Sequence, residues 1–139
     1  MPFFRNVPKS LLFLVTTLLF LGTQAQAQTV FYTFTSDSSL GALGYCVAPA
    51  GDVNNDGVPD IIAGDPEDST WTGVAKVYSG ADGSTLYSIN GVNGNDRFGF
   101  SVAGGADVNG DGFDDFIVGG PESLVEGDEA GFARVYSGA

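Results

Sequence analysis

The 139-residue sequence contains no histidine, one cysteine and only five lysine or arginine residues. The absence of histidine excludes a Ser-His-Asp triad, a Cys-His dyad and any metal site with histidine ligands. A single cysteine, Cys46, excludes an internal disulfide and a cysteine-rich zinc or iron–sulfur site, and we interpret it as a buried small side chain rather than a reactive thiol. The few basic residues stand against 17 acidic ones, for a net charge of −12. Such a charge disfavours nucleic acid and anionic membranes as partners and favours bound cations.

The N-terminal residues 1–27 have the features of a secretory signal peptide. Arg5 and Lys9 precede an uncharged apolar run over 11–22, and small residues follow it up to Ala27. A membrane anchor is the alternative, but the apolar run has about 12 residues, whereas a spanning helix needs about 20. We therefore expect cleavage after Ala27 and a chain that is secreted, periplasmic or at the cell surface, with no membrane span after cleavage.

An internal repeat organises the rest of the chain into units at 43–97 and 98–139. Three motifs recur 55 residues apart, and a fourth recurs 58 residues apart because one loop is longer in the second unit. The matching segments are 43–48 and 98–103, 51–57 and 106–112, 60–66 and 115–121, and 73–81 and 131–139. A unit of this length, with 21 glycines in the whole chain and short β-type runs between glycine turns, is typical of a propeller blade.

The strands can be placed from the same motifs. The first, third and fourth motifs predict three strands in each unit, and residues 85–89 predict a fourth strand in the first unit. In the third strand we expect Lys76 and Arg134 to face away from Val77 and Val135. The run 30–34 predicts an outer strand. It belongs to an N-terminal segment, 28–42, whose remaining residues form a linker to the first unit. The second unit lacks its own fourth strand within this sequence. The predicted fold is all-β, with two four-stranded blades forming part of a propeller ring.

Each unit contains a nine-residue loop with oxygen-bearing side chains at positions 1, 3, 5 and 9. Ca²⁺ takes about six to eight oxygen ligands, and a tight loop can present them from alternate positions. Glycine at position 6 permits the positive φ that a sharp turn requires. We therefore predict two calcium sites rather than two plain acidic turns. The predicted ligands are Asp52, Asn54, Asp56, the Val58 carbonyl and Asp60 in the first loop, and Asp107, Asn109, Asp111, the Phe113 carbonyl and Asp115 in the second.

The residues after these loops distinguish them from an EF-hand loop. An EF-hand loop has an acidic residue at position 12 and a helix afterwards. Position 12 is Ala63 in the first loop and Val118 in the second, and both lie in β-type runs. We therefore expect calcium-bound loops between two strands. Mg²⁺ is disfavoured because it retains its water and takes few protein ligands.

The ordered motifs resemble the FG-GAP repeat of integrin α-subunit β-propellers and of related bacterial secreted proteins. The resemblance rests on Phe-Gly-x-Ser-Val-Ala at 98–103, Asp-x-Asn-x-Asp-Gly-x-x-Asp at 107–115 and Val-Gly-Gly-Pro at 118–121, and it covers about residues 43–139. The first copy differs at Leu43, where the motif has phenylalanine, and at Cys46, where it has serine. The family builds a seven-bladed ring, whereas this sequence supplies two blades.

The resemblance implies a non-catalytic module for extracellular binding or cell adhesion, whose partner is an extracellular protein or glycan. Two alternatives remain open at this point: an accessory propeller fragment of a secreted hydrolase or lyase, and a truncated gene product. Two blades also leave apolar faces and a strand edge uncovered, so we expect self-association through the open blade faces.

Overall fold

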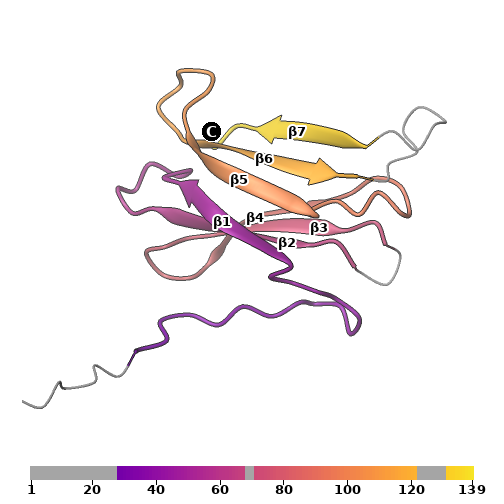
Figure 1. Ribbon diagram of the computed structural model, residues 1–139. Helices are drawn as coiled ribbons and strands as arrows, with labels where there is room; N and C mark the ends of the chain where they lie inside the picture. The colour runs from indigo at the N-terminus through magenta and orange to yellow at the C-terminus, as the bar shows by residue number, and fades with distance from the viewer. Residues whose placement is uncertain (1–27, 68–70, 122–130) are drawn as a thin grey trace, which may run out of the picture. The chain divides into compact units, whose positions relative to one another are not determined.

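The computed structural model describes residues 28–67, 71–121 and 131–139. These residues form two antiparallel sheets, one with strand order β1-β2-β3-β4 and one with order β5-β6-β7 (Figure 1). The all-β prediction is confirmed, and no helix in the described ranges is long and apolar enough to span a bilayer. The predicted signal peptide lies outside the described residues. The strands are β1 (Cys46–Gly51), β2 (Asp60–Asp65), β3 (Val74–Tyr78), β4 (Thr85–Asn90), β5 (Ser101–Ala106), β6 (Asp115–Gly120) and β7 (Phe132–Tyr136).

The outer strand predicted over 30–34 is not formed in the structure. A strand requires a neighbouring strand for its backbone hydrogen bonds, and residues 30–35 make no backbone hydrogen bond among the described residues. Side chains hold this segment instead. The Tyr32 hydroxyl donates to the Ala81 carbonyl at 3.0 Å, and the ring of Phe34 stacks on that of Tyr78 with 3.8 Å between centroids.

The two repeats share the same local irregularity at the end of their first strand. The pairing of β1 with β2 shifts register between Pro49 and Gly51, and that of β5 with β6 shifts between Gly104 and Ala106. Such a bulge adds one residue to a strand and bends it. Because each bulge lies just before a nine-residue loop, the two loops leave their sheets in the same way.

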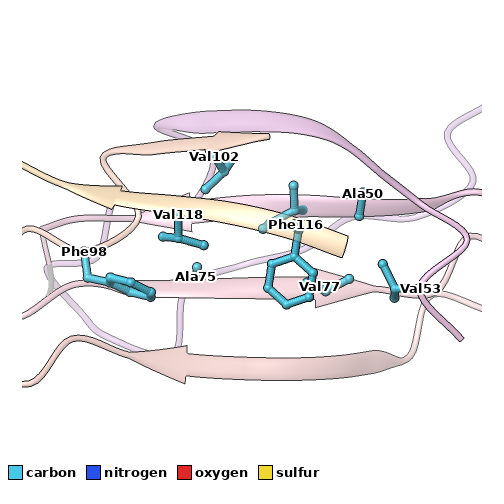
Figure 2. Close-up of a cluster of buried hydrophobic side chains, with 9 residues drawn as sticks. Ala50, Val53, Ala75, Val77, Phe98, Val102, Phe116 and Val118 are labelled. Atoms are coloured by element: carbon cyan, nitrogen blue, oxygen red, sulfur yellow. The ribbon is translucent and has the colours of Figure 1, made fainter. Parts of the chain in front are cut away.

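The hydrophobic core lies between the two sheets (Figure 2). Burial of these apolar side chains is the main favourable contribution to the packing of one sheet on the other. Glycine permits the close approach, because a Cβ on Gly64 would lie only 1.9 Å from the carbonyl oxygen of Gly99. Cys46 packs against this core but is half-buried, whereas the sequence predicted a buried side chain. The core residues are Ala50, Val53, Ile62, Ala75, Val77, Phe98, Val102, Phe116 and Val118.

Truncation of Phe116 tests this core. The side chain is 2 % exposed and contacts the rings of Tyr87 and Tyr136. We expect Phe116→Ala to lower the free energy of unfolding by about 3–5 kcal/mol, because it removes a buried ring and leaves a cavity. Urea denaturation measures the change. The control Val92→Ala removes a side chain that is 68 % exposed, and an equal loss in both variants would contradict the assignment of the core.

Candidate metal centres

The first loop gathers three of its predicted ligands around one turn. The two oxygens of Asp52 accept hydrogen bonds from the backbone N–H groups of Asp56 and Gly57 at 3.0 and 2.9 Å. The Asn54 Oδ1 accepts from the same Asp56 N–H at 3.1 Å. The Asp56 Oδ1 accepts from the Val58 N–H at 2.8 Å. Positions 1, 3 and 5 therefore direct their oxygens to consecutive N–H groups of the same turn.

The second loop repeats these bonds one for one. The two oxygens of Asp107 accept from Asp111 and Gly112 N–H groups at 3.1 and 2.9 Å, and Asn109 Oδ1 accepts from Asp111 at 2.9 Å. The Asp111 Oδ1 accepts from the Phe113 N–H at 2.9 Å. The glycine at position 6 has a φ of 87° in the first loop and 92° in the second. That left-handed conformation explains glycine at both positions.

The ninth residue of each loop is a buried carboxylate that is also the first residue of the central strand. Asp60 is 1 % exposed, and its oxygens accept from the N–H of the loop's second residue at 3.0 Å and from that of Gly80 at 3.0 Å. Asp115 is 4 % exposed and accepts from the corresponding N–H groups, with the Gly138 bond at 3.2 Å. These carboxylates therefore tie each loop to the chain that follows the third strand.

The segment after the third strand was found as a repeat, but its role at the loop was not predicted. A Cβ on Gly80 would lie 2.0 Å from the carbonyl oxygen of Pro59, and one on Gly138 would lie 2.4 Å from that of Asp114. Only glycine allows the chain to approach the loop this closely while its N–H donates to the buried carboxylate. The repeated Ser-Gly-Ala at 79–81 and 137–139 was the available signal.

Two further residues at the loops were also missed. The Asp114 Oδ2 accepts from the Asp52 N–H at 2.8 Å, and the Asp114 N–H donates to the Asp52 carbonyl at 3.1 Å. The Ser137 hydroxyl donates to the Asp111 Oδ2 at 2.9 Å. Asp114 thus joins the second loop to the first. The signal for it was a difference between the copies, since the equivalent residue of the first loop is Pro59.

The electrostatic surroundings of the loops are acidic. The ion pairs within the described residues join Lys76 to Asp37 and Arg97 to Glu67, so the loop carboxylates have no basic partner there. Hydrogen bonds, first from the Phe113 backbone and then from the Asn109 side chain, hold the pKa of Asp111 below its usual value. This carboxyl is therefore ionised at neutral pH, as a cation ligand must be.

The donor set has the chemistry that a hard divalent cation requires. A carboxylate offers about four lone-pair positions, and Asp52, Asp56 and Asp60 each accept two hydrogen bonds. Each therefore keeps oxygen capacity for a cation. Among the described residues, no three acidic or cysteine side chains are arranged as ligands around a single point. The loops therefore supply oxygen atoms of the required kind on a common turn, where hydrogen bonds to the backbone hold them, but they do not form a finished ligand cluster.

Comparison with known proteins finds one family and one group of relatives. Residues 98–136 match the family model described as FG-GAP repeat. Integrin alpha-V of Gallus gallus is 34 % identical over 93 residues, which cover 67 % of this chain and 9 % of the relative. Integrin alpha pat-2 of Caenorhabditis elegans is 38 % identical over 92 residues, covering 60 % and 8 %. Integrin alpha-5 of Xenopus laevis is 35 % identical over 78 residues, covering 56 % and 7 %. The matched part of the chain spans less than a tenth of each of these curated relatives.

The anchoring role of Asp60 can be tested with calcium removed by a chelator. Asp60→Ala leaves one buried and one partly buried N–H group without an acceptor, so we expect it to lower the free energy of unfolding by about 2–4 kcal/mol. Asp60→Asn keeps one acceptor oxygen and should cost less. Urea denaturation measures both. The control Asp82→Ala changes an exposed carboxylate in the turn after β3, and an Asp60→Ala loss no larger than the control loss would show that the carboxylate does not anchor the loop.

Proposed function

We propose that this chain, an FG-GAP repeat protein similar to integrin α subunits, is a secreted calcium-binding propeller module. In this proposal it acts in extracellular binding or cell adhesion and catalyses no reaction. The observation that supports it most is the duplicated loop, in which both repeats place the same acidic and amide side chains on the same backbone N–H groups. A second occurrence of one hydrogen-bond pattern is difficult to explain as a chance acidic turn.

Calcium suits these loops better than other common ions. Each loop combines three carboxylates and one amide, all hard oxygen donors without nitrogen or sulfur, which is the ligand type of Ca²⁺. A divalent ion would neutralise two of the three negative charges and remove most of their mutual repulsion. The proposed ligands are Asp52, Asn54, Asp56, Val58 and Asp60, and in the second loop Asp107, Asn109, Asp111, Phe113 and Asp115.

The proposed role in adhesion rests on the similarity to integrin α subunits together with the loop chemistry. Extracellular modules bind calcium with dissociation constants of about 10⁻⁴–10⁻³ M, so such sites fill outside the cell. The proposed export through residues 1–27 would bring the loops to that environment. Calcium would then stiffen the end of each blade that carries the loop, and the partner would be an extracellular protein or glycan.

Calcium binding is the first test of this proposal. We expect the full chain, secreted and purified, to bind two Ca²⁺ by isothermal titration calorimetry. Asp56→Ala and Asp111→Ala should each remove one site, because each deletes the position-5 carboxylate of one loop. Asp82→Ala should leave both sites intact. No calcium uptake at millimolar concentration would contradict the proposal, as would loss of both sites in the Asp82→Ala control.

Binding to extracellular molecules is the second test. We expect the labelled chain to bind at least one component of a printed array of extracellular-matrix proteins and glycans in millimolar calcium. Chelation, or the double change Asp56→Ala with Asp111→Ala, should reduce that signal at least tenfold. Asp82→Ala should retain it. Equal signals with calcium and with chelator would contradict calcium-dependent adhesion. That outcome would not bear on calcium binding itself, which the calorimetric experiment tests.

A further inference from the structure

The tripeptide Val-Asn-Gly occurs at 92–94, in the segment between the two repeats, and again at 108–110, in the second nine-residue loop. Asparagine is a thermolabile residue, and an asparagine before glycine is especially prone to spontaneous deamidation. The backbone nitrogen of the glycine attacks the side-chain carbonyl carbon of the asparagine, and glycine gives this attack the most conformational freedom and the least steric hindrance. The two tripeptides therefore have the same intrinsic chemistry in different surroundings.

The first loop has a different residue at the attacking position. Asn54 is followed by Asn55, whereas the corresponding Asn109 is followed by Gly110. The side chain of Asn55 obstructs the approach of its own backbone nitrogen to the Asn54 carbonyl carbon. The two loops thus share their pattern of oxygen-bearing side chains but differ in chemical stability at position 3, which supplies the amide ligand of each proposed site.

In the folded second loop, hydrogen bonds hold each group that must react. The nucleophile, the Gly110 N–H, donates to Asp107 Oδ1 at 2.6 Å, and Asn109 Oδ1 accepts from the Asp111 N–H at 2.9 Å. The leaving nitrogen, Asn109 Nδ2, donates to Asp111 Oδ2 at 2.7 Å and to Ser137 Oγ at 3.3 Å. The attacking nitrogen must lose its proton, which the negative charge of Asp107 disfavours. The reaction therefore requires the loop to open locally.

The tripeptide at 92–94 lies outside both loops and provides an internal reference. Its first side chain, Val92, is 68 % exposed. The backbone of Asn93 is held in a turn, because its N–H donates to Asp96 Oδ2 at 2.9 Å and its carbonyl accepts from the Asp96 N–H at 3.2 Å. Neither bond involves the Asn93 side-chain amide or the Gly94 nitrogen, so this turn leaves the reacting groups accessible to each other.

We propose that Asn109 is a deamidation site whose rate is set by opening of the second loop, and that the first loop resists the same change. When the loop opens, the Gly110 nitrogen bonds to Asn109 Cγ and the Cγ–Nδ2 bond breaks. The proton that Gly110 loses reaches the departing nitrogen through water, and ammonia leaves. Water then opens the resulting succinimide ring at either carbonyl, which gives aspartate or isoaspartate. The net reaction converts an amide and water into a carboxylate and ammonium, without an oxidant or reductant.

The isoaspartate product changes the spacing of the second loop. Its backbone runs through the former side chain and gains one carbon atom, which displaces the residues at positions 5, 7 and 9 relative to Asp107. The second loop then loses its ligand spacing, while the first loop retains it. Two loops that are equivalent after synthesis thus become unequal with age. This consequence for calcium rests on the proposed function, whereas the deamidation itself does not.

Peptide mapping by mass spectrometry measures the conversion at each asparagine. The purified full chain is incubated with chelator at neutral pH, either folded, as checked by circular dichroism, or in urea. In urea we expect Asn93 and Asn109 to convert at equal rates within about twofold, because their tripeptides are identical, and Asn54 to convert at least about tenfold more slowly. In the folded chain, Asn109 should convert at least about tenfold more slowly than Asn93, because the closed loop holds its reacting groups.

Three results of this experiment would overturn the proposal. Equal rates at Asn93 and Asn109 in the folded chain would show that the loop gives no protection. Faster conversion of Asn109 in the folded chain than in urea would show that the closed loop promotes the reaction. Conversion of Asn54 as fast as that of Asn109 in urea would show that the two loops do not differ.

The protecting bonds can be removed at Asp107. Asp107→Ala deletes the acceptor of the Gly110 N–H, so we expect the rate at Asn109 in the folded chain to rise toward the rate at Asn93. The control Asp82→Ala should leave both rates unchanged. An unchanged ratio of the two rates in folded Asp107→Ala would contradict protection by these hydrogen bonds.

A second variant transfers the labile sequence to the first loop. Asn55→Gly creates a third Val-Asn-Gly tripeptide at 53–55, and glycine readily adopts the φ of 56° at this position. In urea, Asn54 should then convert as fast as Asn109. Because this comparison is made in the unfolded chain, it does not depend on how the variant folds. A stable Asn54 in this variant would overturn the role assigned to the glycine.

Calcium separates this inference from the proposed function. Calcium bound at the second loop would favour the closed loop, so free calcium at a hundredfold excess over its dissociation constant should slow Asn109 conversion by about a hundredfold. The rate at Asn93 should not change. After long incubation with chelator, calorimetry should find one Ca²⁺ per chain instead of two. If calcium leaves the Asn109 rate unchanged while the results in urea are as expected, calcium binding at the second loop is contradicted and the deamidation site stands.

Discussion

The contact of backbone with backbone between Gly64 and Gly99 is the constraint on which the arrangement of the two sheets depends. Gly64 lies on β2, and Gly99 belongs to the Phe-Gly pair that opens the second repeat. Any side chain at Gly64 would overlap the Gly99 carbonyl. The glycines of two different motifs thus meet across the junction, and the close approach lets Phe98 and Phe116 fill the space between the sheets. Motifs of the two consecutive repeats therefore contact each other at the junction between the sheets.

The strands on either side of each loop determine where the loop lies. Each loop starts after a bulge and ends on a buried aspartate that begins the central strand. That aspartate also accepts a hydrogen bond from the backbone N–H of the glycine after the third strand. The loop, the central strand and the segment after the third strand therefore meet at one carboxylate. A cation held by the same loop would act on all three parts at once. The loop is therefore part of the hydrogen-bonded structure of the blade.

Much of this organisation could be predicted because it depends on residues that are close together in the sequence. The repeated motifs indicated all seven strands, although β1 and β5 each begin three residues after the start of the first motif. The 1-3-5-9 spacing located the turn on which Asp52, Asn54 and Asp56 converge. The remaining features depend on tertiary contacts. Whether residues 30–34 form a strand depends on a pairing partner, which sequence alternation alone does not reveal. Asp114 was overlooked because its acceptor role involves a residue 62 positions away, at Asp52.

The bond between Asp114 and the Asp52 N–H also makes the two loops depend on each other. This charged acceptor ties the second loop to the first, whereas the equivalent residue of the first loop is Pro59, whose side chain accepts no hydrogen bond. Hydrogen bonds to charged groups contribute about 1.5–3 kcal/mol. A change of conformation in the first loop would therefore reach the second loop through a single carboxylate, and the two loops would respond as a coupled pair.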